Sequence, residues 1–344
     1  MGTASNTATH FAGIDVSKDT LDACLLGPSG RTRGKPFAND PDGHAALVAW
    51  ADRRVPSGDI HFCMEATGPY SAACRKVAIA AGRVVSVANP ARVKAHAKAC
   101  GQANKTDPAD ARAIATFARD RNPRPWVPPS PEVRELQGLV RRRDDLRRMA
   151  AGEKNRLDAP DLSPSTRKSI TRTLRLLMKE ADRVQAEAEA VVAATPALAA
   201  DCALLESVQG IGRQTATTVL AELPPVADIR SAESAAADAG LAPTEFTSGT
   251  SVKKHTRLSK AGNARLRAAL YLPTLAAIRF NPVLKGFFER LVAAGKPKMQ
   301  AVGACMRKLV MICYGVLRNR KPFDPQWADH RPTGGSPRVP PVGR

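Results

Sequence analysis

Short apolar runs separated by turn residues fill the first part of the chain. The runs FAGIDVS and LDACLLG, and a third near KPFAN, have the length and alternation of β-strands. The segment DPDGHAALVAWADRR has the pattern of a helix, and it is followed by the strand DIHFCMEATG, the helix YSAACRKVAIAAG and the strand RVVSVAN. A further helix begins at Asp107. Strands and helices in this order predict a mixed α/β layer domain.

The pattern changes after NPRPWVPPSP (residues 122–131), a Pro-rich segment that predicts a linker. The segment EVRELQGLVRRRDDLRRMAAGEKNRL is charged and helical, and the helix after it carries apolar residues four and three apart. These residues form a heptad seam: Ile170, Leu174, Leu177, Ala181, Val184, Ala188 and Val191. The seam is compatible with a coiled coil, antiparallel or between protomers, and with an ordinary pair of amphipathic helices within one chain.

From about residue 201 the pattern is helical and strongly basic, and the last segment, RPTGGSPRVPPVGR, is rich in Pro and Gly. We therefore expect an α/β domain over residues 1–125, linker and coiled-coil helices over 126–200, an all-α domain over 201–330 and a disordered tail over 331–344.

Charge points to a polyanionic partner. Lys and Arg number 52 against 32 Asp and Glu, so the net charge is +20. Between Phe246 and Lys321 there are 16 Lys or Arg and one acid, Glu289. Each neutralised phosphate releases counterions and adds affinity, although a generally basic composition would also produce this excess. Aromatic residues make up 4%, which argues against extensive base stacking on an aromatic platform.

Cysteine usage and hydropathy indicate a cytoplasmic protein without a membrane partner. The seven Cys include no CxxC pair and lie mostly in apolar contexts, such as Cys63 in IHFCM. This is typical of reduced, buried thiols and not of a zinc site or a disulfide framework. No run of 18 apolar residues occurs, and the segment MGTASNTATH has no signal-peptide pattern.

Two acids lie three residues apart in NKTDPADARAIATFARD (residues 104–120). Asp107, followed by Pro108, fits a helix N-cap, and Asp110 falls where a capping box places an acid. The alternative interpretation is that the two carboxylates hold a metal ion.

Two earlier acids favour the metal. Asp15 lies within the strand GIDVSK, and Glu65 ends the strand in CMEATG. Alone, Asp15 could cap the turn before SKDT and Glu65 could bind the amides of the ATG loop. An acid within an apolar strand is costly to bury, however, unless it is paired or binds a metal.

Adjacent strands can bring these two acids to one sheet edge, and a helix packed there could add Asp107 and Asp110, which share one helical face. Four converging carboxylates need cations, and two Mg²⁺ ions about 4 Å apart would fit and would support phosphoryl transfer. This order of acids is the layout of an RNase H-like, RuvC-like nuclease domain.

The segment ESVQGIGRQTATTVLAEL (206–223) predicts a helix-hairpin-helix that binds nucleic-acid backbone. Gly210 and Gly212 would let the backbone approach a phosphate at the start of the second helix. A tight turn in a helical bundle would have the same pattern.

The segment TSGTSVKKHTRLSKAGNARLRAALY (247–271) places three serines among six basic residues and a His. A serine in such a flexible, cationic loop could attack a phosphodiester, or the loop could simply bind phosphate with structural serines. We expect nucleic-acid contacts from the following side chains: Lys105, Lys253, Lys254, Arg257, Lys260, Arg265 and Arg267.

Several of these segments together resemble one family. GIDVSKDTLD, EATGPY, VANPARVKAHAKACGQANKTDPADARAIA, SVQGIGRQTA, GLAPTEFTSGTSVKKHTRLSKAGNARLRAALYLPTLAAIRFNP and MRKLVMICYGVLRNRKPFD are similar to the insertion-sequence transposases of the IS-one-ten type. These are the DEDD transposases, similar to bridge-RNA-guided DNA recombinases. The resemblance covers residues 11 to 325.

The resemblance implies that Asp15, Glu65, Asp107 and Asp110 are the metal-binding DEDD set and that Ser248 is the covalent nucleophile. It singles out Ser248 from Ser251 and Ser259, which spacing alone does not. It also implies a noncoding guide RNA that pairs with donor and target double-stranded DNA. Dimers would pair into a tetramer whose active sites combine the serine domain of one protomer with the DEDD domain of another.

Two other functions are compatible with the same residues. One is a RuvC-like structure-specific endonuclease whose nucleophile is water. The other is a non-catalytic RNA- or DNA-binding protein, against which the intact acids and Ser248 argue.

Overall fold

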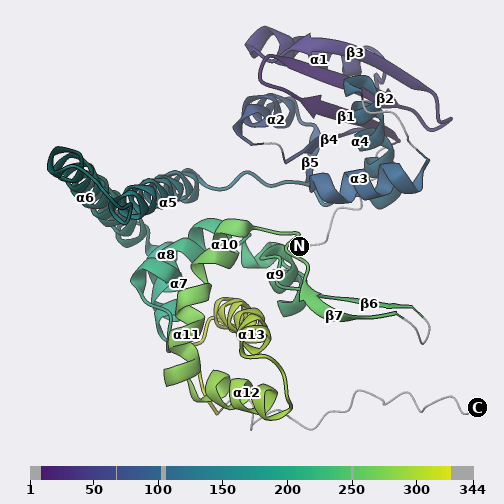
Figure 1. The fold of residues 1–344 in the computed structure, drawn as a ribbon. Coiled ribbons are helices and arrows are strands. Elements are labelled where there is room, and N and C mark those ends of the chain that lie inside the picture. Colours follow the sequence, from purple (N-terminus) through teal and green to yellow (C-terminus); the bar gives the residue numbers. More distant parts are fainter. Residues whose placement is uncertain (1–8, 67, 102–105, 249–251, 327–344) are drawn as a thin grey trace, which may run out of the picture. The chain divides into compact units, whose positions relative to one another are not determined.

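The computed structural model describes residues 9–66, 68–101, 106–248 and 252–326 (Figure 1). The chain divides into two compact units, Met1–Pro128 and Pro129–Arg344. The first unit is a sheet covered by helices, and the second is helical with one β-hairpin.

The first unit is built on a five-stranded sheet in the order β3-β2-β1-β4-β5. The first three strands are antiparallel neighbours, and β4 and β5 run parallel to β1. This is the mixed sheet that the sequence predicted for an RNase H-like domain. The strands are β1 (His10–Val16), β2 (Thr20–Leu26), β3 (Thr32–Ala38), β4 (Ile60–Glu65) and β5 (Val84–Ala88).

Alternating side chains give the sheet two apolar faces, because successive residues of a strand point to opposite sides. One face, with Ile14, Leu21 and Phe62, packs against α1 (Pro41–Asp52) and α2 (Ala72–Ala80). The opposite face packs against α4 (Asp107–Arg121), which in turn contacts α3 (Pro90–Ala99). The sequence analysis did not foresee α3, whose first turn is capped by Asn89. A short 3-10 turn, Pro69–Ser71, precedes α2.

The beginning of the predicted linker adheres to the first unit. Helix α4 ends at Asn122, which has left-handed backbone angles. The Ser86 hydroxyl lies within hydrogen-bonding distance of the carbonyls of Pro123 and Arg124, and the Trp126 amide donates to the carbonyl of Val85 at 2.7 Å. The part of the linker that no such bond holds therefore begins after Trp126.

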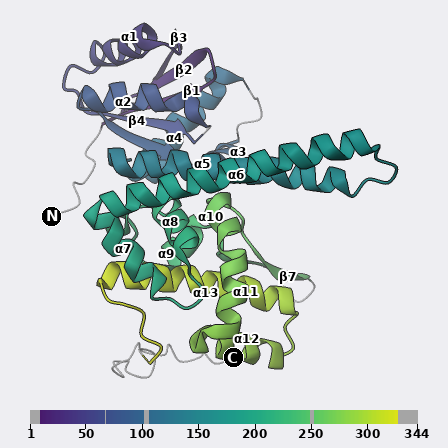
Figure 2. The same cartoon turned by 90° about the vertical axis from the view of Figure 1, so that its left-hand side faces the viewer.

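The second unit begins with a long helical hairpin of α5 (Pro131–Leu157) and α6 (Pro164–Ala194), which run side by side in Figure 2. Of the heptad seam, Ala181 and Val184 pack against Leu146 of α5 within the same chain. Ala188 joins the main core of the unit. Within one chain, this part of the seam makes an antiparallel pair of amphipathic helices.

The remaining helices surround one apolar core, in which α13 is central. By length and composition α13 alone, among single helices in the described residues, could cross a membrane, but Leu309, Val310 and Cys313 are fully buried in this core. The helices are α7 (Pro196–Glu206), α8 (Arg213–Glu222), α9 (Ala232–Asp238), α10 (Ala264–Ala269), α11 (Tyr271–Phe280), α12 (Pro282–Ala293) and α13 (Lys298–Asn319), with a 3-10 turn at Val226–Asp228.

The β-hairpin of the second unit consists of β6 (Pro243–Ser248) and β7 (Val252–Leu258), and it interrupts the helices in Figure 1. The sequence analysis expected a flexible loop within a helical region here. Alternating Thr, Phe, Val and His residues instead favour paired strands, because such residues pack well on a pleated surface. The expected tail over 331–344 lies outside the described residues.

Candidate active site

A glycine in the first strand lets α4 lie directly on the sheet. A Cβ atom at Gly13 would lie 2.2 Å from the carbonyl oxygen of Ala111 and 2.2 Å from the amide nitrogen of Ala115. A glycine within a strand often marks such a close backbone approach. Because Ala111 and Ala115 are also small and fully buried, the first half of α4 is held close over β1.

The strand acids point to the side of the sheet that α4 covers. Asp15 is two residues from Gly13, so it shares the face on which Gly13 meets α4. Ile14 pairs with Met64, which makes Asp15 and Glu65 the next residues along two adjacent parallel strands. Cys63, two residues before Glu65, packs in the same apolar cluster as Ile114 of α4.

The N-terminus of α4 supplies the other two acids, and it corrects one prediction. Thr106, with extended angles of φ −142° and ψ 151°, is the N-cap, and its carbonyl accepts the Asp110 amide at 2.8 Å. Asp107 is therefore the first helical residue and not the cap. The Thr106 side chain makes no cap hydrogen bond, and Asp107 lies one position inside the helix, so the N-cap interpretation of Asp107 was wrong.

The pKa shifts of the strand acids indicate that the four carboxylates lie close to one another. The pKa of the Asp15 carboxyl is raised by burial and then by the charges of Asp110 and Asp107. The pKa of Glu65 is raised by burial and by the charges of Asp15 and Asp110. Each charge therefore disfavours ionisation of its neighbours.

A cation would relieve this repulsion. Among the ion pairs of the described residues, none involves Asp15, Glu65 or Asp110. Carboxylate oxygens are the ligands that hard divalent cations such as Mg²⁺ prefer. The donor chemistry of Asp15, Glu65, Asp107 and Asp110, called the carboxylate set below, thus fits divalent cations.

The sequence analysis missed two residues of this region. Asp22 is the cross-strand partner of Asp15, and its pKa is raised by burial and by the charge of Asp107. Its signal was the alternation of TLDACLL, which puts Asp22 on the face opposite Leu21 and Ala23. The other is Gly13, whose signal was a glycine inside an apolar strand.

Ser248 is the last residue of β6, where its backbone pairs with Val252 at the end of the hairpin away from its base. The side chains of Ser248, Lys253 and Lys254 lie outside the described part of the structure, as do Lys105 and Ser251 entirely. Ser259 lies at the opposite end of the hairpin, where its amide donates to the carbonyl of Ala242 at 2.8 Å.

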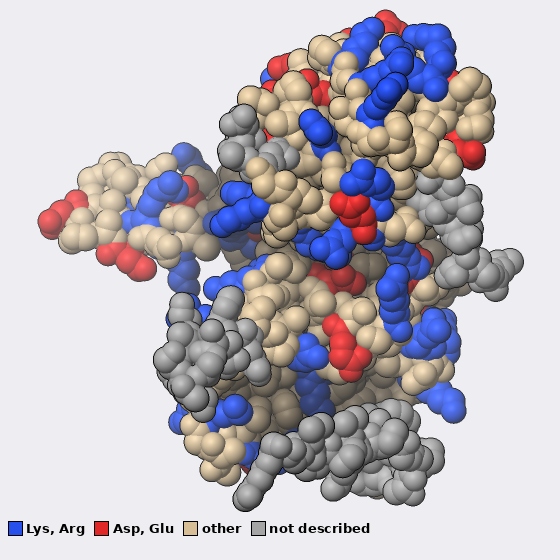
Figure 3. Space-filling view, turned by 90° about the vertical axis from the view of Figure 1, so that its right-hand side faces the viewer, with Lys and Arg blue, Asp and Glu red and all other residues tan. Residues whose placement is uncertain are grey.

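The predicted phosphate-binding side chains of the second unit that the structure describes have different surroundings. Arg257 and Lys260 are exposed. Arg267 instead folds back, donating to the carbonyls of Ala239 at 3.1 Å and Lys260 at 3.3 Å, which is a structural role. Figure 3 shows Lys and Arg side chains recurring over the face in view, with fewer acids among them.

The predicted helix-hairpin-helix is present as α7, a turn and α8, and its two glycines differ. Gly210 has φ +102°, and a Cβ there would lie 2.6 Å from the Cβ of Ala277, so this glycine is needed for packing against α11. Gly212 is exposed with open space around its Cβ position, and it is the N-cap of α8, where no side chain makes a cap hydrogen bond.

Beside this helix end lies a cavity of about 490 Å³, called the arginine cavity below. Its basic residues are Arg143, Arg147, Arg148 and Arg265, and Gln214 and Thr215 of the first turn of α8 also line it. Arg143 is buried and fixed by bonds to Asp144, Gln185 and Thr218. The other three arginines pair with Asp182 or Asp145. Clustered guanidinium groups beside a helix N-terminus suit a phosphate, which would here compete with these acids.

Known proteins resemble this chain over most of its length. A family model described as a transposase, of the DEDD type of IS110, matches residues 12–160, and one described as the transposase IS116/IS110/IS902 family matches residues 202–289. The pilin gene-inverting proteins of Moraxella bovis and Moraxella lacunata are each 31% identical over 91% of this chain and 97% of their own length.

An uncharacterized 43.6 kDa protein of insertion element IS110 from Streptomyces coelicolor is 27% identical over 44% of this chain and 36% of that protein. Among solved structures, Thermus thermophilus RuvC in complex with a Holliday junction substrate is 18% identical, with a TM-score of 0.27 over 34% of this chain and 99% of RuvC. A second structure of the same RuvC gives 19% identity and the same TM-score.

Proposed function

Because the chain belongs to the IS110 family of transposases, we propose that its carboxylate set and Ser248 form one active site for cutting and rejoining DNA strands. The observation that carries this proposal is the convergence of Asp15, Glu65, Asp107 and Asp110 where α4 meets the sheet at Gly13. Such a cluster is costly without cations, and a site that needs cations suits phosphoryl transfer.

The carboxylate set would hold the metal, which we take to be two Mg²⁺ ions, and the ions would polarise the scissile phosphate. The protein's own contribution is position. The contact of Gly13 with Ala111 and Ala115 holds the first half of α4 on the sheet, and this would keep Asp107 and Asp110 near the strand acids.

Ser248 would supply the nucleophile. Its Oγ forms a bond to phosphorus, the bond from phosphorus to a deoxyribose oxygen breaks, and the freed strand end takes up a proton as the serine loses one. A strand-end hydroxyl then attacks the phosphoserine and restores the phosphodiester. Both steps exchange one phosphate ester for another, so no ATP is required.

The binding partners that we propose rest on the net charge of the chain and on the names of its relatives. The pilin gene-inverting proteins carry the name of a DNA rearrangement, which supports double-stranded donor and target DNA as substrates here. The net charge of +20 and the arginine cavity support additional binding of a structured guide RNA. We further propose an assembly of dimers into a tetramer, with the serine and the carboxylates of each site coming from different protomers.

A trapping experiment tests the chemistry. Labelled DNA with a nick near the scissile phosphate loses its short end after attack, so a covalent protein–DNA adduct accumulates. We expect a Mg²⁺-dependent adduct that peptide mapping places on Ser248. Ser248→Ala should abolish it, while Ser259→Ala, at the other end of the hairpin, should retain it.

Two outcomes would contradict the proposal. Metal-dependent cleavage without an adduct would favour water as the nucleophile, as in a structure-specific endonuclease. An adduct on another residue would remove Ser248 from its role. For composite sites, mixing Ser248→Ala with Asp15→Asn protomers should restore part of the activity, and no recovery in subunits shown to exchange would argue that each chain builds its own site.

A further inference from the structure

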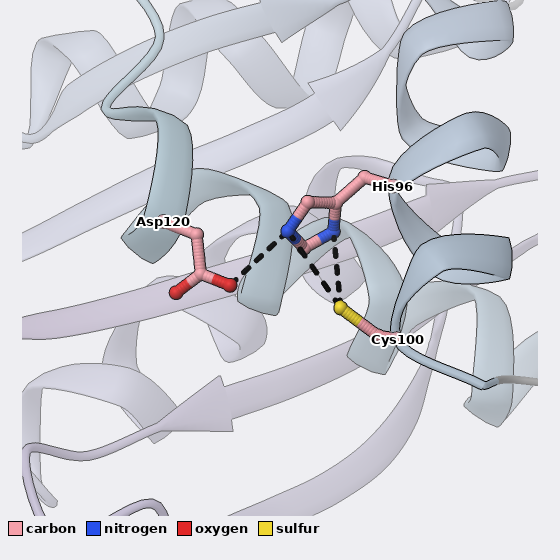
Figure 4. A group of neighbouring side chains, drawn as sticks. All are labelled: His96, Cys100 and Asp120. Carbon is pink, nitrogen blue, oxygen red and sulfur yellow. Dashed lines mark hydrogen bonds and ion pairs between the residues drawn. The ribbon is translucent and has the colours of Figure 1, made fainter.

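Three metal-ligating side chains meet away from the carboxylate set, at the far ends of α3 and α4 (Figure 4). His96 and Cys100 are one helical turn apart, and Asp120 belongs to the last turn of α4. The His96 Nε2 atom lies 3.1 Å from Asp120 Oδ2 and 3.8 Å from Cys100 Sγ. One ligand atom from each residue lies within 4.8 Å of the other two.

The two separations from the His96 nitrogen are close to those of a tetrahedral zinc site. With Zn–N and Zn–O bonds of about 2.0 Å and a Zn–S bond of about 2.3 Å, tetrahedral angles place N and S about 3.6 Å apart and N and O about 3.3 Å apart. Small side-chain rotations would bring the observed 3.8 and 3.1 Å to those values. One nitrogen, one sulfur and one oxygen ligand suit a borderline-soft ion such as Zn²⁺.

The surroundings hold two of the three ligands in place. His96 is buried, and its ring packs edge-on against Phe117 at 5.7 Å between centroids. The second oxygen of Asp120 accepts a bond from Arg119 Nε at 2.8 Å, which fixes the orientation of the carboxylate. Such outer contacts commonly orient metal ligands. Cys100 and Asp120 are exposed, which leaves access for the ion and for a water as fourth ligand.

We propose that His96, Cys100 and Asp120 bind one Zn²⁺ ion that ties the end of α3 to the end of α4. The spacing of the Cys residues gave no sign of it, because only one ligand is a Cys. A zinc ion here would cross-link the end of α3 to the last turn of α4. Helix α4 carries Asp107 and Asp110 at its other end. The site is independent of the proposed DNA chemistry.

Cobalt substitution provides the test. Co²⁺ bound to a thiolate has a sulfur-to-cobalt charge-transfer band in the near ultraviolet, which a carboxylate site cannot produce. We expect the reduced, full-length protein to bind one Co²⁺ with this band and to lose it when Zn²⁺ is added. Cys100→Ser and His96→Gln should abolish the band, and Arg119→Ala should weaken Co²⁺ binding by about 10-fold.

The controls are chosen so that this proposal and the DNA chemistry fail separately. Glu65→Gln, in the carboxylate set, and Asp42→Asn, exposed in the first turn of α1, should leave the band unchanged. Added Zn²⁺ should raise the melting temperature of the wild type and not that of Cys100→Ser. No thiolate band in the folded wild type, or a band that survives Cys100→Ser, would overturn the proposal.

Discussion

The carboxylate set and the β6–β7 hairpin are the two parts of the proposed active site, and they are built in opposite ways. The carboxylates sit on a covered sheet, where β1 is bonded on both sides and α4 lies on it at van der Waals distance. Ser248 ends a strand of a sheet that, in the described part of the chain, consists of two strands.

The difference indicates a division of labour. The close packing of α4 on β1 fixes the backbone segments that carry the carboxylates before any partner arrives, at the cost of mutual repulsion. A two-stranded hairpin gains little stability from its own pairing, so the proposed nucleophile has a weaker support than the carboxylates. In the proposed chemistry, a rigid metal site combined with an adaptable nucleophile would suit a serine that must meet one strand, release it and meet another.

The largest effect should come from removing one charge of the rigid part. Asp107→Asn and Asp110→Asn should each lower strand exchange by at least about 10³-fold, which corresponds to about 4 kcal/mol of transition-state stabilisation. The melting temperature should not fall, since Asp107 is not the cap of α4 and the loss of either charge relieves the repulsion on Asp15. Near-normal activity in Asp107→Asn, measured with the same DNA, would separate this residue from the site.

The next largest effect should come from disturbing the close contact between β1 and α4. Gly13→Ala inserts a methyl group into the backbone of α4 and should lower the free energy of unfolding by about 3 kcal/mol, as overpacking does. Gly34→Ala is the matched control, because its Cβ would have Ala23 O as nearest neighbour at 3.6 Å. Urea unfolding measures both, and equal losses would argue against a special contact at Gly13.

The repulsion within the carboxylate set should make the free energy of unfolding depend on pH. The pKa of Asp15 is raised, so its ionisation destabilises the metal-free fold as pH rises through that pKa. Asp15→Asn should therefore unfold at higher denaturant than the wild type at pH 7, and the gain should vanish below the ordinary carboxyl pKa of 3.8.

Divalent metal should reverse this order of stability, so that the wild type becomes more stable than Asp15→Asn. At 100 times its Kd, Mg²⁺ should stabilise the wild type by about 2.7 kcal/mol and leave Asp15→Asn nearly unaffected. Thermal melts with and without Mg²⁺ supply the measurement. A wild type that metal does not stabilise, or an Asp15→Asn variant less stable than the wild type at every pH, would contradict the electrostatic account.

The smallest effect concerns binding outside the chemistry. Arg148→Ala, in the arginine cavity, should weaken nucleic-acid binding uniformly across sequences and reduce the slope of log K against log salt by about 1. Arg183 of α6 is also exposed and also ion-paired, with Glu180 and Glu187 where Arg148 has Asp145, but it lies outside the cavity, so Arg183→Ala serves as control. Identical salt slopes for both variants would argue that the cavity binds no phosphate.

The sequence was most informative where side-chain pattern and backbone agree. The five strands, the acids Asp15 and Glu65 and the helix starting at Asp107 followed from periodicity and order. The capping role of Asp107 failed, because a Thr-Asp-Pro start is compatible with either residue as the cap and only the extended angles of Thr106 decide it.

What the sequence could not supply was contact between distant segments. The role of Gly13 depends on the contact of α4 with β1, which lies far from it in the sequence. The place of Asp22 beside the carboxylate set depends on the strand register that pairs it with Asp15. The hairpin around Ser248 was expected as a loop because its glycine and basic residues outweighed its alternating pattern. Its assignment as nucleophile came from family resemblance and stays a prediction.

Because the linker is attached to the first unit as far as Trp126, only a short tether joins this unit to α5. The Trp126 amide bonds to Val85, and α5 begins at Pro131, so only four residues, Val127 to Ser130, join the last anchored residue to the helical unit. Fully extended, the five steps span about 18 Å at most, and the two prolines make the tether stiff. If the helical unit binds nucleic acid as proposed, this tether gives the carboxylates an effective concentration of that nucleic acid that dilution does not change.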